Sequence, residues 1–314
     1  MTRYRNALPQ MAGSLFLTDA GLETDLIFNH GVEIREFAAH TLLPDPQGRA
    51  AVARYFEGYL ALARANDAGF VLDTVTWKAH RHWAADLGET PDRLRLANED
   101  AVALAAELRE QAGNAQPIVL NAVIGPRGDA YRPEHRIEAA DAERYYAEQL
   151  GWLVPTVVDM VTGLTFNQVG EAVGLVRAAR TAGLPVVISF TVETDGRLPG
   201  GQPLREAIEQ VDAETEAGAA YFMVNCAHPD HFSEALEGEW ARRIRGVRAN
   251  ASRRSHAELD EAPDLDAGDP HELGRLYADL RRRLPWLNVF GACCGGDLRH
   301  VTCIAGEVAA QRAA

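Results

Sequence analysis

A short apolar strand runs into two adjacent cysteines in the stretch Val289-Phe290-Gly291-Ala292-Cys293-Cys294-Gly295-Gly296-Asp297. The apolar run is typical of a buried parallel strand, and it ends where the glycines begin. Successive side chains of a strand point to opposite faces. Glycines at a turn allow positive φ angles and close backbone approach. Both thiols can therefore converge on one point beyond the strand end.

Seven similar apolar runs precede this strand, at residues 15–19, 70–76, 118–124, 157–165, 185–191, 221–225 and 244–250. Helical periodicity lies between them, at residues 47–66, 92–112, 140–153, 169–182, 204–217 and 272–283, and resumes from 298. This alternation is typical of parallel βαβ units. Eight units in 314 residues favour a closed (β/α)8 TIM barrel over an open doubly wound sheet. No linker or low-complexity tract divides the chain, so we expect one barrel domain over residues 1–314.

The composition narrows the classes of partner and compartment. With 47% apolar residues the chain can bury a large core, and its net charge of -14 argues against nucleic acid or an anionic membrane as partner. We find no N-terminal signal and no apolar run near the roughly 18 residues that span a bilayer. Four cysteines without a small-domain spacing pattern fit a reducing compartment, and we expect the cytoplasm. A homo-oligomer is left open.

A third cysteine ends another predicted strand, at Asn225-Cys226. Barrel active sites lie where the carboxyl ends of the strands meet the following loops, so Cys226 is expected near Cys293 and Cys294. Zinc prefers sulfur and nitrogen ligands, and catalytic sites keep one position open. Three thiolates make the metal a weak Lewis acid toward water, but a coordinated incoming thiol is still deprotonated. The ligand set therefore suits alkyl transfer to sulfur.

Other interpretations of these residues remain open at this point. The cysteine pair could be buried small hydrophobes unrelated to Cys226, which is the role we expect for Cys303 on the last helix. A histidine as fourth zinc ligand would make the site structural, although solvated loop positions are the more common role. The histidines concerned are His80, His82, His228 and His231.

Several motifs together resemble the zinc-dependent homocysteine S-methyltransferase family, from Leu17 to about Ala309. The Asn225-Cys226 and Gly291-Ala292-Cys293-Cys294-Gly295 segments are similar to its two zinc motifs. Further similarities lie at Thr18-Asp19-Ala20-Gly21-Leu22-Glu23-Thr24-Asp25-Leu26, at Thr74-Val75-Thr76-Trp77, and at Ile188-Ser189-Phe190-Thr191 with Asp195-Gly196-Arg197-Leu198. The paired cysteine motifs are specific, whereas the other segments would be weak evidence alone.

The resemblance implies a (β/α)8 barrel, zinc held by the three cysteines, and methyl transfer by in-line displacement from an onium or folate donor to the thiol of homocysteine, giving methionine. It places Asp19, Gly21 and Asp25 near the polar end of the substrate. Thr165, Thr76, Trp77 and Asn225 are further substrate-site candidates. Structural roles compete with these: the two aspartates could cap a loop or helix, Asn225 could brace a turn, and the Thr76-Trp77 pair could complete the core.

Three departures from the family pattern stand out. Ala20 and Ala292 replace glycines and are small enough to be tolerated. Leu164 stands before Thr165 where the family carries a glutamate that holds the ammonium of homocysteine. Unless Asp25, Glu193 or another acid substitutes for it, the ammonium loses its charge partner, and a different thiol acceptor is possible. Without a cobalamin- or folate-binding extension, a small onium donor such as S-methylmethionine or betaine fits best.

Three hypotheses from different classes follow. The first is a zinc-dependent thiol methyltransferase using Cys226, Cys293 and Cys294. The second is a zinc-dependent barrel lyase or hydrolase, which histidine or carboxylate ligands would favour and three sulfurs disfavour. The third is a non-catalytic barrel whose thiol cluster clamps a structural zinc or senses redox state.

Overall fold

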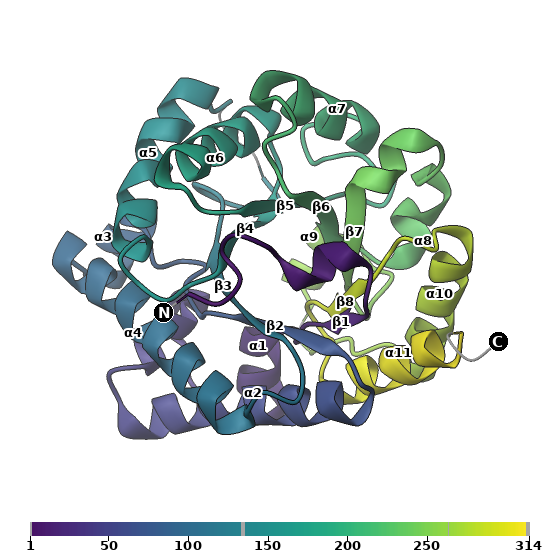
Figure 1. Ribbon diagram of the computed structural model, residues 1–314, viewed down its shortest axis with the longest axis horizontal. Coiled ribbons are helices and arrows are strands. Elements are labelled where there is room, and N and C mark those ends of the chain that lie inside the picture. Colours follow the sequence, from purple (N-terminus) through teal and green to yellow (C-terminus); the bar gives the residue numbers. More distant parts are fainter. Residues whose placement is uncertain (1, 133–135, 263, 312–314) are drawn as a thin grey trace.

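A computed structural model describes residues 2–132, 136–262 and 264–311 as a closed barrel of eight parallel strands in chain order. The strands surround a central axis and the helices form an outer ring (Figure 1). The strands are β1 (Phe16–Leu17), β2 (Gly69–Asp73), β3 (Ile118–Ile124), β4 (Met160–Phe166), β5 (Val186–Thr191), β6 (Tyr221–Asn225), β7 (Ile244–Ala249) and β8 (Val289–Ala292). The (β/α)8 TIM barrel predicted from the sequence is confirmed.

The helices pack their apolar faces on the outside of the barrel. The longer ones are α2 (Pro46–Ala65), α4 (Pro91–Ala112), α5 (Ala139–Leu153), α6 (Val169–Ala182), α7 (Leu204–Thr215), α10 (Pro270–Arg283) and α11 (Leu298–Ala310). Short ones are α1 (Leu22–Thr24), α3 (Ala84–Leu87), α8 (Pro229–Phe232) and α9 (His256–Asp260). Within the described ranges, no helix combines the length and apolarity needed to cross a membrane.

Local sequence explains where the long helices begin. Asp45 precedes Pro46, and its carboxylate accepts a hydrogen bond from the Gly48 backbone N–H at 2.7 Å. Thr90 precedes Pro91 and its hydroxyl accepts from the Arg93 N–H at 3.3 Å. Such side chains satisfy backbone donors that have no partner inside the helix, and proline fits the first helical position.

The strands differ from the sequence prediction mainly at their ends. β4 begins at Met160 rather than at residue 157, because the Asp159 carboxylate instead accepts the Leu120 N–H and pairs with Arg109 at 2.8 Å. Near its other end the pairing with β5 shifts between Gly163 and Phe166. Such a bulge re-aims side chains at a barrel rim. Between β6 and β7, where the sequence shows no long helical period, the only α-helix described is the four-residue α8.

Candidate metal and thiol-binding site

Three cysteines meet at the carboxyl-end mouth of the barrel. Cys226 follows β6, Cys293 and Cys294 follow β8, and their sulfur atoms all lie within 4.8 Å of one another. No other histidine, cysteine or acidic group of the described ranges belongs to this group. We call these residues the thiol cluster. The structure places the sulfurs together, and their binding of a metal stays a prediction.

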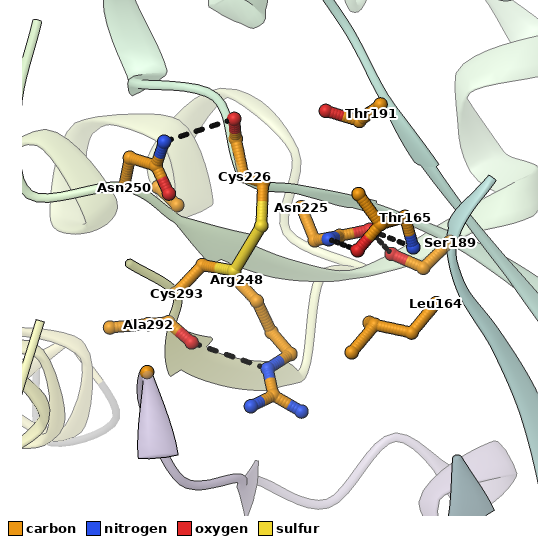
Figure 2. Close-up of a disulfide and its surroundings, with 12 residues drawn as sticks. Leu164, Thr165, Ser189, Thr191, Asn225, Cys226, Arg248, Asn250, Ala292 and Cys293 are labelled. Carbon is orange, nitrogen blue, oxygen red and sulfur yellow. Dashed lines mark hydrogen bonds between the residues drawn. A yellow bond between two sulfur atoms is a disulfide. The ribbon is translucent and has the colours of Figure 1, made fainter. Parts of the chain in front are cut away.

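Two members of the thiol cluster are joined to each other. Cys226 and Cys293 form a disulfide, while Cys294 is a free cysteine (Figure 2). We expected three reduced thiols from the cysteine count, so the oxidised pair is a difference from that expectation. The thiolate is the form that binds metals, and a disulfide sulfur carries no such charge. Metal binding by all three residues therefore requires the reduced state.

The backbone around Cys226 is fixed from β7. Its N–H donates to the Arg248 carbonyl at 3.0 Å, and its carbonyl accepts from Asn250 Nδ2 at 3.1 Å. Cys226 has a φ of 54°. Left-handed backbone at a non-glycine residue is uncommon and persists where its surroundings determine it. The conformation turns the sulfur away from the strand direction and toward the β8 turn.

Asn225 ties the thiol cluster to the neighbouring strands. Its Oδ1 accepts from the Thr165 N–H at 3.0 Å and from Ser189 Oγ at 2.6 Å, and its Nδ2 donates to Thr165 Oγ1 at 2.8 Å (Figure 2). Thr165 is itself strained, with a φ of 64°. These bonds assign a bracing role to Asn225 and occupy the Thr165 hydroxyl. Substrate contact by either residue stays a prediction.

Gly21 is placed by packing against the cysteine turn. A Cβ atom at this residue would lie 2.7 Å from the Cys293 carbonyl oxygen, which is closer than a side chain allows. The Gly21 N–H also approaches the Gly296 carbonyl at 3.4 Å, and the Gly295 N–H approaches Thr24 Oγ1 at 3.4 Å. Helix α1 therefore lies directly beside the turn that carries Cys293 and Cys294.

Asp19 belongs to a buried ionic group that the sequence analysis missed. Arg248, at the end of β7, donates to Asp19 Oδ1 at 2.7 Å and also pairs with Asp73 from β2. Asn121 Nδ2 donates to Asp73 Oδ1 at 2.7 Å, and Thr162 Oγ1 donates to Asn121 Oδ1 at 2.9 Å. We call these five residues the Arg248 cluster. The sequence offered one signal for this group: Arg248 is a charged side chain within the strand predicted at residues 244–250.

Burial and charge set the protonation of the Arg248 cluster. Burial raises the pKa of Asp19, Arg248 opposes that shift, and Asp73 adds to it. Burial alone would lower the pKa of Arg248, but the two carboxylates raise it above its usual range. The guanidinium also donates to the Ala292 carbonyl at 3.2 Å and the Ala20 carbonyl at 3.1 Å. Arg248 therefore remains a cation whose donors are largely engaged by the protein.

The remaining predicted substrate residues have protein partners. Asp25 Oδ1 accepts from Asn29 at 2.7 Å. The buried Thr76 hydroxyl donates to the Val123 carbonyl at 2.7 Å. Trp77 is half-buried and donates from Nε1 to the Leu164 carbonyl at 3.0 Å. These contacts support the structural alternatives, while a role in binding substrate is still a prediction for all three residues.

Leu164 lines the barrel interior among apolar and polar side chains. It borders a small cavity of about 10 Å³, about the space of one water molecule. Met160 and Met223 line this cavity together with Arg248 and the Asp73 that Arg248 binds. Figure 2 shows the Leu164 side chain on the same side of the disulfide as Arg248. The end of β4 therefore offers a bound molecule no carboxylate.

Some sequence expectations for histidines and Cys303 are wrong. His80 and His228 are buried rather than solvated, with His80 Nδ1 2.5 Å from the Tyr145 hydroxyl and His228 Nδ1 accepting the Asp230 N–H at 3.3 Å. His82 is exposed and His231 is half-buried. Cys303 is half-buried, 3.6 Å from His271 Nδ1, rather than a core residue.

Cys294 is the half-buried free cysteine of the thiol cluster. Burial, and after it the charge of Glu23, raises the pKa of its thiol to about 11. The Tyr131 ring lies close enough for Cys294 to influence the pKa of its hydroxyl, and it stacks on His256 with ring centroids 4.1 Å apart. Without a metal, the Cys294 thiol is therefore protonated at neutral pH.

The residues present fit a thiophilic cation such as zinc. Three cysteine sulfurs within 4.8 Å form a compact donor set, and sulfur is a preferred zinc ligand. The buried Asn250 Oδ1 has no hydrogen-bond partner among the described atoms and can accept from a ligand. The site has the composition of a three-sulfur metal site when Cys226 and Cys293 are reduced.

Comparison with known proteins identifies the family. The family model described as homocysteine S-methyltransferase matches residues 16–308. The chain belongs to this family of methyl-transferring enzymes, as the motifs suggested. Betaine–homocysteine S-methyltransferase 1 of Rattus norvegicus is 26% identical over 191 aligned residues, covering 55% of this chain and 45% of that protein. The same enzyme of Mus musculus is 25% identical over the same extent.

Solved structures show the same fold. The homocysteine methyltransferase MmuM from Escherichia coli in its oxidised form has a TM-score of 0.72 and 16% identity, covering 94% of this chain and 96% of that one. Its metallated form has a TM-score of 0.68 and 17% identity with equal coverage. The chain spans about half the length of the betaine–homocysteine relatives that it matches.

Proposed function

We propose that this protein is a zinc-dependent enzyme that transfers a methyl group from a small onium donor, such as S-methylmethionine or betaine, to a thiol acceptor, with homocysteine as acceptor and methionine as product. The observation that carries the proposal is the thiol cluster, because three sulfurs within 4.8 Å lie at the barrel mouth. Family membership supports the same chemistry. A related barrel methyltransferase acting on another thiol is the alternative, because Leu164 provides no carboxylate.

Cys226, Cys293 and Cys294 would hold the zinc ion, which supplies a means of keeping an acceptor sulfur as a thiolate at neutral pH. Asn225 and Asn250 fix the backbone on both sides of Cys226. The protein thereby holds a ligand in a defined orientation, since groups that support metal ligands govern both geometry and affinity. The Cys226–Cys293 disulfide must first be reduced, with two electrons and two protons.

Methyl transfer is a displacement at carbon. A bond forms from the acceptor sulfur to the methyl carbon as the bond from that carbon to the donor's sulfonium or ammonium atom breaks. The donor leaves as a neutral thioether or tertiary amine, so no acid is needed to protonate it. The protein's contribution is to align the two reactants and exclude water.

The aromatic side chains at the mouth suit a cationic donor. Tyr131 stacks on His256 near Cys294, and the half-buried Trp77 lies on the β2 side. Aromatic faces attract onium groups. Tyr131, which lies near Cys294, is therefore the aromatic side chain best placed to hold an onium donor beside the thiol cluster.

A redox-sensing thiol cluster is a second candidate function, favoured by the disulfide between Cys226 and Cys293. In that function the barrel would report oxidation without transferring a group. A lyase or hydrolase is less favoured because no histidine or carboxylate joins the thiol cluster within the described ranges.

The test is methionine formation by reduced, zinc-loaded protein supplied with homocysteine and either S-methylmethionine or betaine. Cys294→Ser should lower the rate more than about 100-fold, since loss of a ligand exceeds the loss expected for a supporting group. Cys303→Ser is the control, because Cys303 lies on α11 outside the thiol cluster. Absence of methionine with both donors, or a fully active Cys294→Ser variant, would contradict the proposal.

A further inference from the structure

Most acidic side chains around the barrel mouth already have an ion-pair or hydrogen-bond partner in the protein, and one does not. Asp19 and Asp73 both bind Arg248. Asp25 accepts from Asn29. Within the described ranges, the Glu23 carboxylate forms no ion pair and receives no hydrogen bond from another residue. Glu23 is therefore available to a cationic ligand.

Glu23 also lies close to the thiol cluster. It is part of α1, whose preceding Gly21 packs against the Cys293 carbonyl and whose Thr24 hydroxyl faces the Gly295 N–H. Glu23 lies between these two contact residues in the chain, so its side chain extends from the helix that borders the cysteine turn. The side chain is half-buried, so a ligand can reach it while water only partly screens its charge.

The β4 side of the mouth offers no carboxylate that is free to bind a cation. Leu164 is apolar, and the hydroxyl of Thr165 already accepts from Asn225. Arg248 cannot hold a cation, and its two aspartates are engaged with it. A thiol that also carries an ammonium group would therefore leave that charge without a partner on the β4 side.

We propose that Glu23 binds the ammonium group of an amino-acid thiol acceptor whose sulfur lies beside Cys294. This inference rests on the proposed function and defines its acceptor as an amino thiol. An ammonium group donates charge-assisted hydrogen bonds to a carboxylate. The trimethylammonium group of betaine has no N–H to donate, so with betaine as the methyl donor Glu23 distinguishes acceptor from donor. The α1 side of the mouth replaces the β4 side as the place where the ammonium is held.

The experiment compares homocysteine with 4-mercaptobutanoate, the same chain without the ammonium group. Calorimetry gives the Kd of each thiol for reduced, zinc-loaded protein, and initial rates with betaine as the methyl donor give kcat/KM and the KM of the donor. In Glu23→Gln, homocysteine should bind about 10- to 100-fold more weakly, the range for a hydrogen bond to a charged group. Binding of 4-mercaptobutanoate and the KM of the donor should change less than about two-fold.

Glu193→Gln is the matched control, because Glu193 is another half-buried acid at the mouth, after β5. It should leave both thiols unaffected. Equal weakening of both thiols in Glu23→Gln, a change confined to the donor's KM, or a homocysteine-specific loss in Glu193→Gln instead would overturn the inference. If wild type bound both thiols equally well and methylated them, the Glu23 inference alone would fail. If wild type bound and methylated neither, the proposed function would fail with it.

Discussion

The thiol cluster and the Arg248 cluster share one barrel mouth but differ in how the sequence encodes them. Cys293 and Cys294 are adjacent and flanked by glycines, so their local context already suggests a site. Arg248 meets Asp19 and Asp73 only across 229 and 175 residues of chain. The comparison shows that reactive groups can be recognised locally, whereas the charges that support the mouth become partners only when the barrel closes.

The largest effect is expected from breaking the Arg248 cluster. Arg248→Met would leave two buried carboxylates without their cation, which should lower the free energy of unfolding by about 3–5 kcal/mol. Urea denaturation measures this change. Arg245→Met is the matched control, because Arg245 lies on the same strand and forms no ion pair within the described residues.

The Arg245→Met variant should lose no more than about 1 kcal/mol. The combined variant Asp19→Asn, Asp73→Asn, Arg248→Met should recover part of the loss, because no charge then stays unpaired. Equal losses in Arg248→Met and Arg245→Met would show that the cluster contributes no ionic stabilisation.

A second prediction concerns a buried carboxylate that has no cation. Glu171 Oε1 accepts from the Tyr146 hydroxyl and the Arg127 N–H, both at 2.6 Å, and burial raises its pKa to about 7. The unfolded chain ionises near the ordinary value of 4.5. Between these two pH values only the folded state keeps the proton. Stability is therefore fully present below 4.5 and is lost as the pH rises to about 7.

The expected loss is about 3 kcal/mol, at roughly 1.4 kcal/mol for each pKa unit. Glu171→Gln mimics the protonated carboxyl and should remove this part of the pH dependence. Glu57→Gln, at an exposed position of α2, should keep it. Unfolding free energies measured from pH 4.5 to 7.5 provide the comparison. The same pH slope in Glu171→Gln and wild type would mean that Glu171 does not titrate in this range.

A third prediction, with a smaller effect, distinguishes the role of the thiol cluster from that of the Arg248 cluster. Asn225→Ala removes the brace beside Cys226, while Asn121→Ala removes an amide of the Arg248 cluster. Both should lower stability by about 1–3 kcal/mol, because each leaves buried partners unsatisfied. Only Asn225→Ala should weaken zinc binding, by about 10- to 100-fold, as for other residues that orient metal ligands. Competition with a chromophoric chelator measures both affinities, and equal affinities would refute the bracing role.

The fold was largely predictable because most strands are short, mainly apolar segments followed by a helical period. The ends of the strands were less predictable. Asp159 lies within an apolar run of the sequence, but its carboxylate accepts a hydrogen bond from the Leu120 N–H, and β4 begins only at the next residue. The convergence of Cys226 on the vicinal pair followed from the rule that barrel sites lie at strand ends.

Other features of the site depend on tertiary contacts that local sequence does not contain. In the sequence, Arg248 is a charged residue that interrupts an apolar strand. Only the folded barrel brings Asp19 and Asp73 into contact with it. His80 reads as a loop residue, yet the fold buries it against Tyr145. The disulfide was also not predicted, because the cysteine count suggested reduced thiols.

The central claim is that the three sulfurs bind one metal and leave room for a fourth sulfur from the acceptor. Zinc-edge X-ray absorption of reduced protein loaded with one equivalent of zinc tests it most directly. The account predicts three zinc–sulfur distances of about 2.3 Å, and a fourth when homocysteine is added. Failure to retain zinc under reducing conditions, or a coordination shell that homocysteine leaves unchanged, would contradict it.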